Sequence, residues 1–235
     1  MGISRYLAMT AAEMATFSVM EGWSAAYMAC HFSPYATGIS NVPSSLPSGS
    51  MLILNDRTPF HGHDPQQILA QLQEISTHVC FDCLLLDFER PDVDACAELC
   101  HVLTKQLSCP VGVSAPYAKG LECPVFLPPA PLDQPLADYV SLWKGREVWL
   151  DIATEAACIT VTQTGSAIAP VSFSAPPENA FVEDTLCCRY RAEITEDAVR
   201  FHLWRDLTEA EHLIEHAQSL GITKCIGLFQ QLCSA

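Results

Sequence analysis

The chain has 235 residues, 49% of them hydrophobic, and carries a net charge of −15 with only 12 basic residues. Nucleic acid and anionic membrane surfaces are excluded as partners, because both are bound through clustered Lys and Arg. No apolar run reaches the roughly 18 residues that a membrane span requires.

Short apolar runs alternate with helical patterns along the chain, which is typical of βαβ units. Several runs are apolar at successive positions, as expected when both faces of a parallel sheet are covered. Eight such runs without a long gap predict an α/β fold that closes into a compact (β/α)8 TIM barrel. The expected strands are residues 5–9, 25–31, 51–55, 83–89, 111–114, 124–127, 148–152 and 225–229.

Three helices are indicated between these strands by caps and apolar spacing. Asp64 followed by Pro65 is a good start for a helix over 66–76. A second helix is expected over 92–107, from its apolar stripe. A third is expected over 207–220, where Gly221 is a typical residue just beyond a helix end.

Between Cys158 and Arg205 the pattern changes to alternating, β-like segments separated by polar turns at 164–165 and 195–197. We expect a small antiparallel β insertion here, at about 158–205, after the seventh barrel strand. It is too short to form an independent domain, so residues 1–235 are predicted to form a single barrel domain.

The strongest chemical pattern is FDCLLLDFERP, residues 81–91. Asp87 and Glu89 are two residues apart at the end of an apolar strand, which puts both carboxylates on one side of it. Active sites of barrels are built at this end of the strands. Neighbouring carboxylates oppose each other's ionisation, so one pKa is expected to rise and provide a general acid. The alternative is an ion pair of Glu89 with Arg57 or Arg90 at the strand end.

This segment resembles the fourth-strand motif of family 18 glycoside hydrolases, the chitinase-like group, in which the pattern is D-x-x-D-x-D-x-E. Asp82, Asp87 and Glu89 occupy the first, third and last acidic positions. The resemblance implies hydrolysis of an N-acetylhexosamine-containing glycan or short oligosaccharide, without a cofactor. Glu89 would protonate the glycosidic oxygen, and Asp87 would orient the N-acetyl group that attacks the anomeric carbon.

The sequence departs from that family's pattern at several positions. Leu85 replaces the middle Asp, Cys83 replaces the usual Gly, and the third and sixth strands lack the family's Ser-x-Gly-Gly and Met-x-Tyr-Asp. A catalytically degenerate barrel that binds sugar or a protein partner is therefore the second hypothesis.

Other polar or aromatic residues fall at or near predicted strand ends and are candidates for substrate binding. Trp149 alternates with Asp151 on one strand, so that one residue can stack on a sugar while the other hydrogen-bonds it. The full set of candidates is His31, Asn55, Asp56, Tyr117, Trp149, Asp151 and Gln230.

A metal-dependent hydrolase using His61 and His63 is the third hypothesis, since imidazoles and carboxylates at a barrel mouth suit zinc or manganese. The twelve cysteines suggest no such site. The pairs Cys80/Cys83 and Cys96/Cys100 are separated by a strand and should not converge. Most thiols lie within apolar segments, and no secretion signal is recognised, so we expect reduced core thiols in a cytoplasmic protein.

Overall fold

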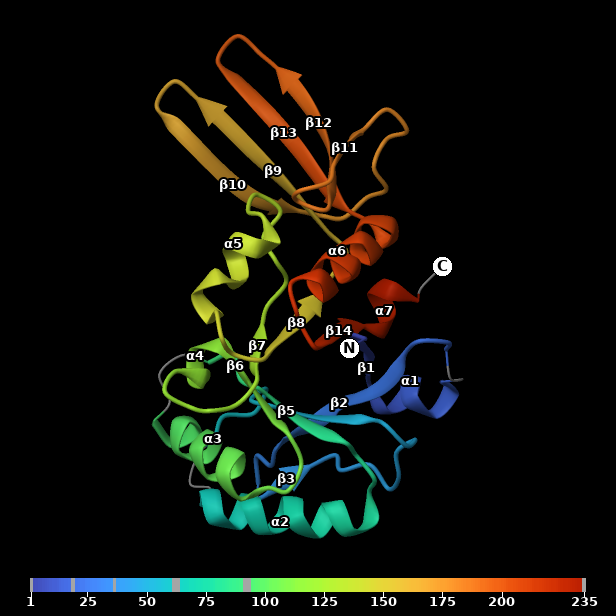
Figure 1. Ribbon diagram of the computed structural model, residues 1–235, viewed down its shortest axis with the longest axis vertical. Helices are drawn as coiled ribbons and strands as arrows, with labels where there is room; N and C mark the ends of the chain where they lie inside the picture. The colour runs from blue at the N-terminus through green and yellow to red at the C-terminus, as the bar shows by residue number, and fades with distance from the viewer. Residues whose placement is uncertain (1, 18–19, 36, 61–63, 91–93, 234–235) are drawn as a thin grey trace.

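The computed structural model describes residues 2–17, 20–35, 37–60, 64–90 and 94–233. Eight parallel strands form a closed ring, because β1 pairs with β14 on one side and with β2 on the other. Figure 1 shows this barrel in the lower part of the molecule. The predicted α/β barrel is confirmed. Its strands are β1 (Ser4–Met9), β2 (Ser24–Phe32), β4 (Met51–Asn55), β5 (Cys83–Asp87), β6 (Val111–Ser114), β7 (Val125–Leu127), β8 (Val148–Ile152) and β14 (Lys224–Leu228).

The observed strands match the expected runs, with two differences that concern the candidate site. β5 ends at Asp87, whereas the prediction extended it to Glu89. β14 ends at Leu228, and Phe229 already begins a short helix, α7 (Phe229–Leu232). In both places an apolar residue, Phe88 or Phe229, follows the last backbone pairing, so hydropathy alone overestimates the strand length.

The two helix boundaries that were predicted from capping residues are confirmed. Asp64 accepts the N–H of Gln66 at 3.0 Å and starts α2 (Pro65–His78). Gly221, with φ of 82°, follows α6 (Leu207–Ser219). The other described helices are α1 (Ala11–Thr16), α3 (Asp94–Gln106), α4 (Ala115–Ala118), α5 (Leu136–Val140) and the 3-10 turn η1 (Ser141–Trp143). In the described ranges, no helix has the length and apolarity needed to cross a membrane.

The helical layer around the barrel is reduced at several connections. Between β2 and β4, the described chain forms only the two-residue strand β3 (Ile39–Ser40), which pairs antiparallel with the end of β2. Three of the remaining connections carry helices of six residues or fewer, and the short helix α7 follows the last strand. The barrel is therefore compact, as expected from the short chain.

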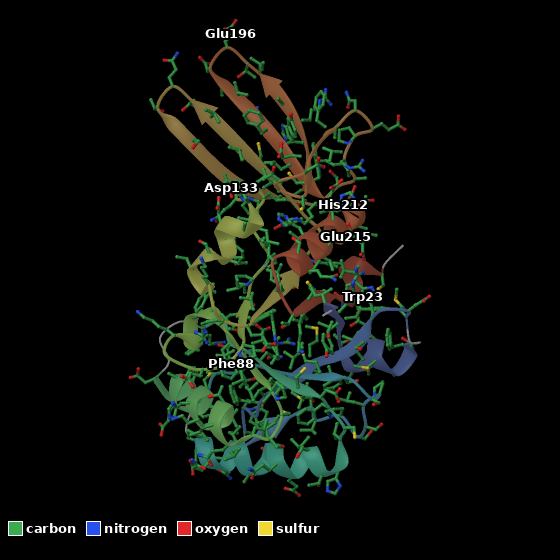
Figure 2. All side chains as sticks on the ribbon, in the orientation of Figure 1. Trp23, Phe88, Asp133, Glu196, His212 and Glu215 are labelled. Carbon is green, nitrogen blue, oxygen red and sulfur yellow. The ribbon has the colours of Figure 1, made fainter. Side chains whose placement is uncertain are left out.

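The predicted antiparallel insertion follows β8, the seventh strand of the barrel, and lies outside the ring. Its five strands pair in the order β10-β9-β13-β12-β11. Figure 1 shows this sheet at the top of the view, beyond α5 and α6, and Figure 2 places Glu196 at the tip of its β12–β13 hairpin. The strands are β9 (Glu155–Thr162), β10 (Gly165–Val171), β11 (Phe181–Glu183), β12 (Cys188–Ile194) and β13 (Ala198–Arg205).

Arg205 links the base of this sheet to the barrel through hydrogen bonds and an ion pair. Its guanidinium is fully buried, donates to the carbonyls of Ala130 (2.7 Å), Leu186 (3.1 Å) and Cys187 (3.2 Å), and forms an ion pair with Glu155. Because Glu155 begins the sheet and Arg205 ends it, this pair joins the two points where the chain leaves and rejoins the barrel.

The core has two layers that follow the alternation of side chains along each strand. On β5, Leu84 and Leu86 pack outward against the helices, whereas Cys83 and Leu85 point into the barrel. The interior is filled by side chains such as Tyr6, Met51, Phe126, Trp149 and Ile226. The ring is a packed core and not a pore, so an active site of the usual barrel type would lie above it, at the carboxyl ends of the strands.

Candidate active site

Asp87 is the last residue of β5 and stands directly above the filled barrel interior. Cys83 and Leu85 occupy the interior positions of the same strand, so alternation directs Asp87 inward at the mouth. The Ser114 hydroxyl lies 3.5 Å from Oδ1 of Asp87. A carboxyl group is therefore held at the end of the barrel where chemistry is built.

Glu89 follows β5 on a segment that is held at several points. The Phe88 side chain is fully buried in the layer between barrel and helices, where it packs against Phe32 and Tyr117 with ring centroids 5.6 and 5.9 Å apart; Figure 2 shows Phe88 in this lower part of the molecule. Its N–H donates to the Ser114 hydroxyl at 3.1 Å. Phe88 thus anchors the chain, while Glu89 is exposed.

Asp56, just after β4, supports the same segment from the neighbouring strand. It is 5% exposed, and its carboxylate accepts the N–H groups of Glu89 (3.2 Å) and Arg90 (2.8 Å). The Arg90 guanidinium donates to the backbone carbonyls of Asp56 and Arg57. Neither Asp87 nor Glu89 forms an ion pair with any described residue, so the alternative of a Glu89–arginine pair finds no support within those residues.

A cavity of about 590 Å³ opens beside the two acids. This volume is within the range of small-molecule sites, roughly 300–1,000 Å³. Among its described lining residues there is no Phe, Tyr or Trp, so a ligand would be recognised there mainly by polar groups. The lining residues are Thr10, Ala11, Ala12, Met28, Ala29, His31, Asn41, Asn55, Asp56, Arg57, Asp87 and Glu89.

Two carboxyl groups at the carboxyl end of the barrel have raised pKa values. Burial raises the pKa of Asp87 to about 6, and the charges of Glu89 and Asp56 add to the effect, while the Ser114 hydroxyl opposes it. Burial also raises the pKa of Asp151 to about 7, with the charge of Asp87 as the next cause. Perturbed acids beside a cavity are typical of functional sites.

Three of the predicted binding residues line the cavity together with Asp87 and Glu89. They are His31, Asn55 and Asp56. The Asn55 amide is oriented by the Met28 carbonyl, to which it donates at 2.9 Å, and by the Arg57 N–H, which it accepts at 3.1 Å. Nδ1 of His31 lies 3.2 Å from the Ala29 carbonyl oxygen.

The other four predicted binding residues lie elsewhere. Trp149 is fully buried in the barrel interior and donates to Glu147 at 2.9 Å, so it has no exposed face on which a sugar can stack. Tyr117 is buried in the outer layer, and its hydroxyl donates to the Arg90 carbonyl. Gln230 is exposed on α7 and hydrogen-bonds Glu13. Asp151 points into the mouth but is not among the residues that line the cavity.

Some residues of the site were not foreseen from the sequence. Thr10 follows β1, and its hydroxyl and N–H both donate to Glu13, forming the capping box of α1. Ser114 ends β6 and touches both Asp87 and the segment that carries Glu89. Thr10 and Ser114 are polar residues at strand ends. The same criterion selected Asn55 and Asp56 from the sequence, and it could have identified Thr10 and Ser114 as well.

The proposed metal ligands His61 and His63 lie outside the described residues. Within the ranges that the structure describes, no three His, Cys, Asp or Glu side chains are gathered in a way that could hold a metal ion. The twelve cysteines, all described, are unpaired, and most are buried or half-buried.

No protein-family model matches the chain, and neither does any curated protein. Several solved structures do. A GH18 chitinase from Cycas revoluta, a double mutant in complex with (GlcNAc)4, gives a TM-score of 0.55 at 10% identity, over 95% of this chain and 94% of that chain. The class V chitinase from Nicotiana tobaccum gives 0.52 at 9%, over 95% and 92%. The Bacillus cereus spore cortex-lytic enzyme SleL gives 0.50 at 9%, over 96% and 70%.

These likenesses confirm the fold suggested by the fourth-strand motif. The chain has a closed TIM barrel similar to those of these chitinases and of the spore cortex-lytic enzyme. At such identities the likeness concerns the fold, and function has to be argued from the site itself.

Proposed function

We propose that this protein hydrolyses the glycosidic bond of an N-acetylhexosamine-containing glycan, with Glu89 as the general acid and Asp87 as its partner. The observation that carries the proposal is the shared cavity: both acids line it at the carboxyl end of a barrel, and no described arginine neutralises either of them. The two acids have different surroundings, as two different roles require.

Glu89 suits the part of proton donor. Its side chain is exposed and borders the cavity, while its backbone is held by Asp56 and by the buried Phe88 next to it. A proton passes from Glu89 to the glycosidic oxygen as the bond to the anomeric carbon breaks. Glu89, now ionised, then takes a proton from the water that completes hydrolysis, which restores the starting state.

Asp87 suits the part of the group that orients the substrate. It is held inward by β5 beside the Ser114 hydroxyl. A carboxylate there accepts a hydrogen bond from the N–H of an N-acetyl group and so directs the acetyl oxygen to the anomeric carbon, which is the substrate-assisted route. The (GlcNAc)4 bound by the Cycas revoluta chitinase is a ligand of this class. We place this reaction in the cytoplasm, because most of the cysteines lie within apolar segments and are expected to be reduced thiols.

The test is turnover of short N-acetylglucosamine oligomers, followed by mass spectrometry of the products. Glu89→Gln should lower turnover by about 10²–10⁴-fold, the usual worth of general acid catalysis. Glu98→Gln, which changes an exposed residue of α3, is the matched control and should leave turnover unchanged. Equal turnover in both variants would remove Glu89 from the mechanism.

A non-catalytic sugar-binding barrel is the second candidate. Two observations favour it: the position below Asp87 is the apolar Leu85, and the described cavity lining contains no Phe, Tyr or Trp. Titration calorimetry with the same oligomers separates the two candidates. Binding without turnover in the wild-type protein supports the binder, whereas turnover that Glu89→Gln removes supports the enzyme.

A further inference from the structure

The buried carboxyl of Asp87 has no acidic neighbour on its own strand inside the barrel. The interior position two residues earlier is Leu85, which belongs to the apolar cluster that fills the ring. Any carboxyl that shares the buried environment of Asp87 must therefore come from another strand.

Asp151 on β8 meets this requirement. Trp149, two residues before it, lies in the same interior cluster as Leu85, and alternation directs both Asp87 and Asp151 inward above that cluster. The Trp149 ring reaches across to Gly112, whose register partner on β5 is Leu85. The two aspartates thus stand over one common floor, made by Leu85, Gly112 and Trp149.

The charges around the two aspartates are almost entirely negative. Asp87 faces Glu89 and Asp56, together with the Ser114 hydroxyl. Besides Asp87, the groups whose charges interact with that of Asp151 are Glu89, Tyr139, Glu155 and Cys225.

The nearby cations are engaged elsewhere. Arg205 pairs with Glu155, and Lys224 lies over the Trp149 ring, 5.1 Å from its centroid. Arg57 lines the cavity, but it is exposed and forms no ion pair with either aspartate among the described residues. A second negative charge on these carboxyls is therefore not balanced by an ion pair, and it is costly in a largely buried position.

We propose that Asp87 and Asp151 act as a pair that holds one proton between them near neutral pH, with Asp151 as the positioning residue that lets Asp87 remain ionised. The proton moves between the two carboxyls, and the charge of the pair stays at −1. Burial, together with the charge of the other aspartate or of its acidic neighbours, raises the pKa of both carboxyls, as expected for two acids that cannot easily ionise together. The role of the pair in catalysis rests on the proposed function, whereas the sharing of the proton does not.

The proton sharing is tested by ¹³C NMR titration of the aspartate side-chain carboxyls. Asp87→Asn should lower the apparent pKa of Asp151 by roughly one unit or more, the coupling expected of an interacting pair. Glu155→Gln is the comparison, because Glu155 is already paired with Arg205, and its shift should be smaller. An Asp151 titration that is unchanged in Asp87→Asn, or that moves more in Glu155→Gln, would overturn the pair.

The catalytic role is tested separately by the pH profile of kcat/KM on N-acetylglucosamine oligomers. In the wild-type protein, activity should fall as the shared proton leaves and the charge of the pair becomes −2, near pH 7. Asp151→Asn fixes the pair at a charge of −1, so its activity should persist to higher pH. An alkaline limb that stays in place in Asp151→Asn overturns the positioning role. A protein without turnover in which the NMR coupling is present would contradict the proposed function and leave the pair standing.

Discussion

The carboxylate of Asp56 accepts the backbone N–H of Glu89 at 3.2 Å across 33 residues of sequence. A second bond, to the N–H of Arg90, makes Asp56 the support of the whole segment that follows β5. One strand of the barrel thus fixes the position of the candidate acid carried by the next.

Asp56→Ala should therefore reduce catalysis while leaving the barrel folded. Both N–H groups lose their acceptor, and Glu89 is no longer held against the cavity; a displacement of about 1 Å can cost roughly 10²-fold in rate. The measurement is kcat on N-acetylglucosamine oligomers, with circular dichroism to confirm the fold. Asp56→Asn keeps one carbonyl acceptor and should lose less. Equal activity in wild type and Asp56→Ala would show that Glu89 is positioned by other contacts.

Asp87→Asn should make the protein more stable at neutral pH. The ordinary pKa of an Asp is about 3.9, and in the folded protein burial raises that of Asp87 to about 6. The folded state therefore binds the proton more tightly than the unfolded chain. This stabilisation is fully present below about pH 4 and is lost as the pH rises through 6. A shift of about two units corresponds to roughly 3 kcal/mol, which the variant should recover in part.

Urea unfolding at pH 7.5 and at pH 4 measures this effect. Asp87→Asn should raise the free energy of unfolding at pH 7.5 by about 2 kcal/mol and leave it nearly unchanged at pH 4. Asp133→Asn is the control: Figure 2 shows Asp133 near the base of the insertion sheet, and its side chain is exposed. A gain of the same size at both pH values would trace the effect to packing and not to ionisation.

The barrel was predictable from the sequence because its strands are buried on both faces. The run at 83–86 is apolar at successive positions, and such runs, separated by capped helices, leave little choice of fold. The end of β5 was not predictable, since the apolar Phe88 follows Asp87 although it packs outward beyond the last pairing.

The sequence correctly predicted those site residues that lie at the carboxyl end of a strand, because that position alone puts them at the cavity. Asp87, Asn55 and Asp56 follow directly from the ends of β5 and β4. Trp149 looked equivalent to Asp151 on the same strand, but the two lie at different depths of the barrel: one fills the interior, and the other stands above it. Depth depends on strand stagger, which a single sequence does not reveal.

Arg205→Met should destabilise the protein strongly. The buried guanidinium satisfies three carbonyls and the Glu155 carboxylate, and its removal leaves an uncompensated charge at the base of the insertion. Breaking a buried ion pair from one side costs about 3–5 kcal/mol. Urea unfolding measures the loss, with Arg200→Met, an exposed site on the same strand, as the control. If both variants unfolded at the same urea concentration, Arg205 would not be the fastening point.

Gly112→Ala tests the floor beneath the two aspartates. A Cβ at this position would lie 2.3 Å from two carbons of the Trp149 ring, which is fully buried. Overpacking of this kind costs about 1–3 kcal/mol. Gly2→Ala, where an added Cβ meets no atom within 4 Å, is the control and should be neutral. The decisive comparison is with the double variant: in a Trp149→Phe background the smaller ring leaves space, so Gly112→Ala should cost less there. An equal cost in both backgrounds would mean that Gly112 is required for its backbone and not for the space it leaves to Trp149.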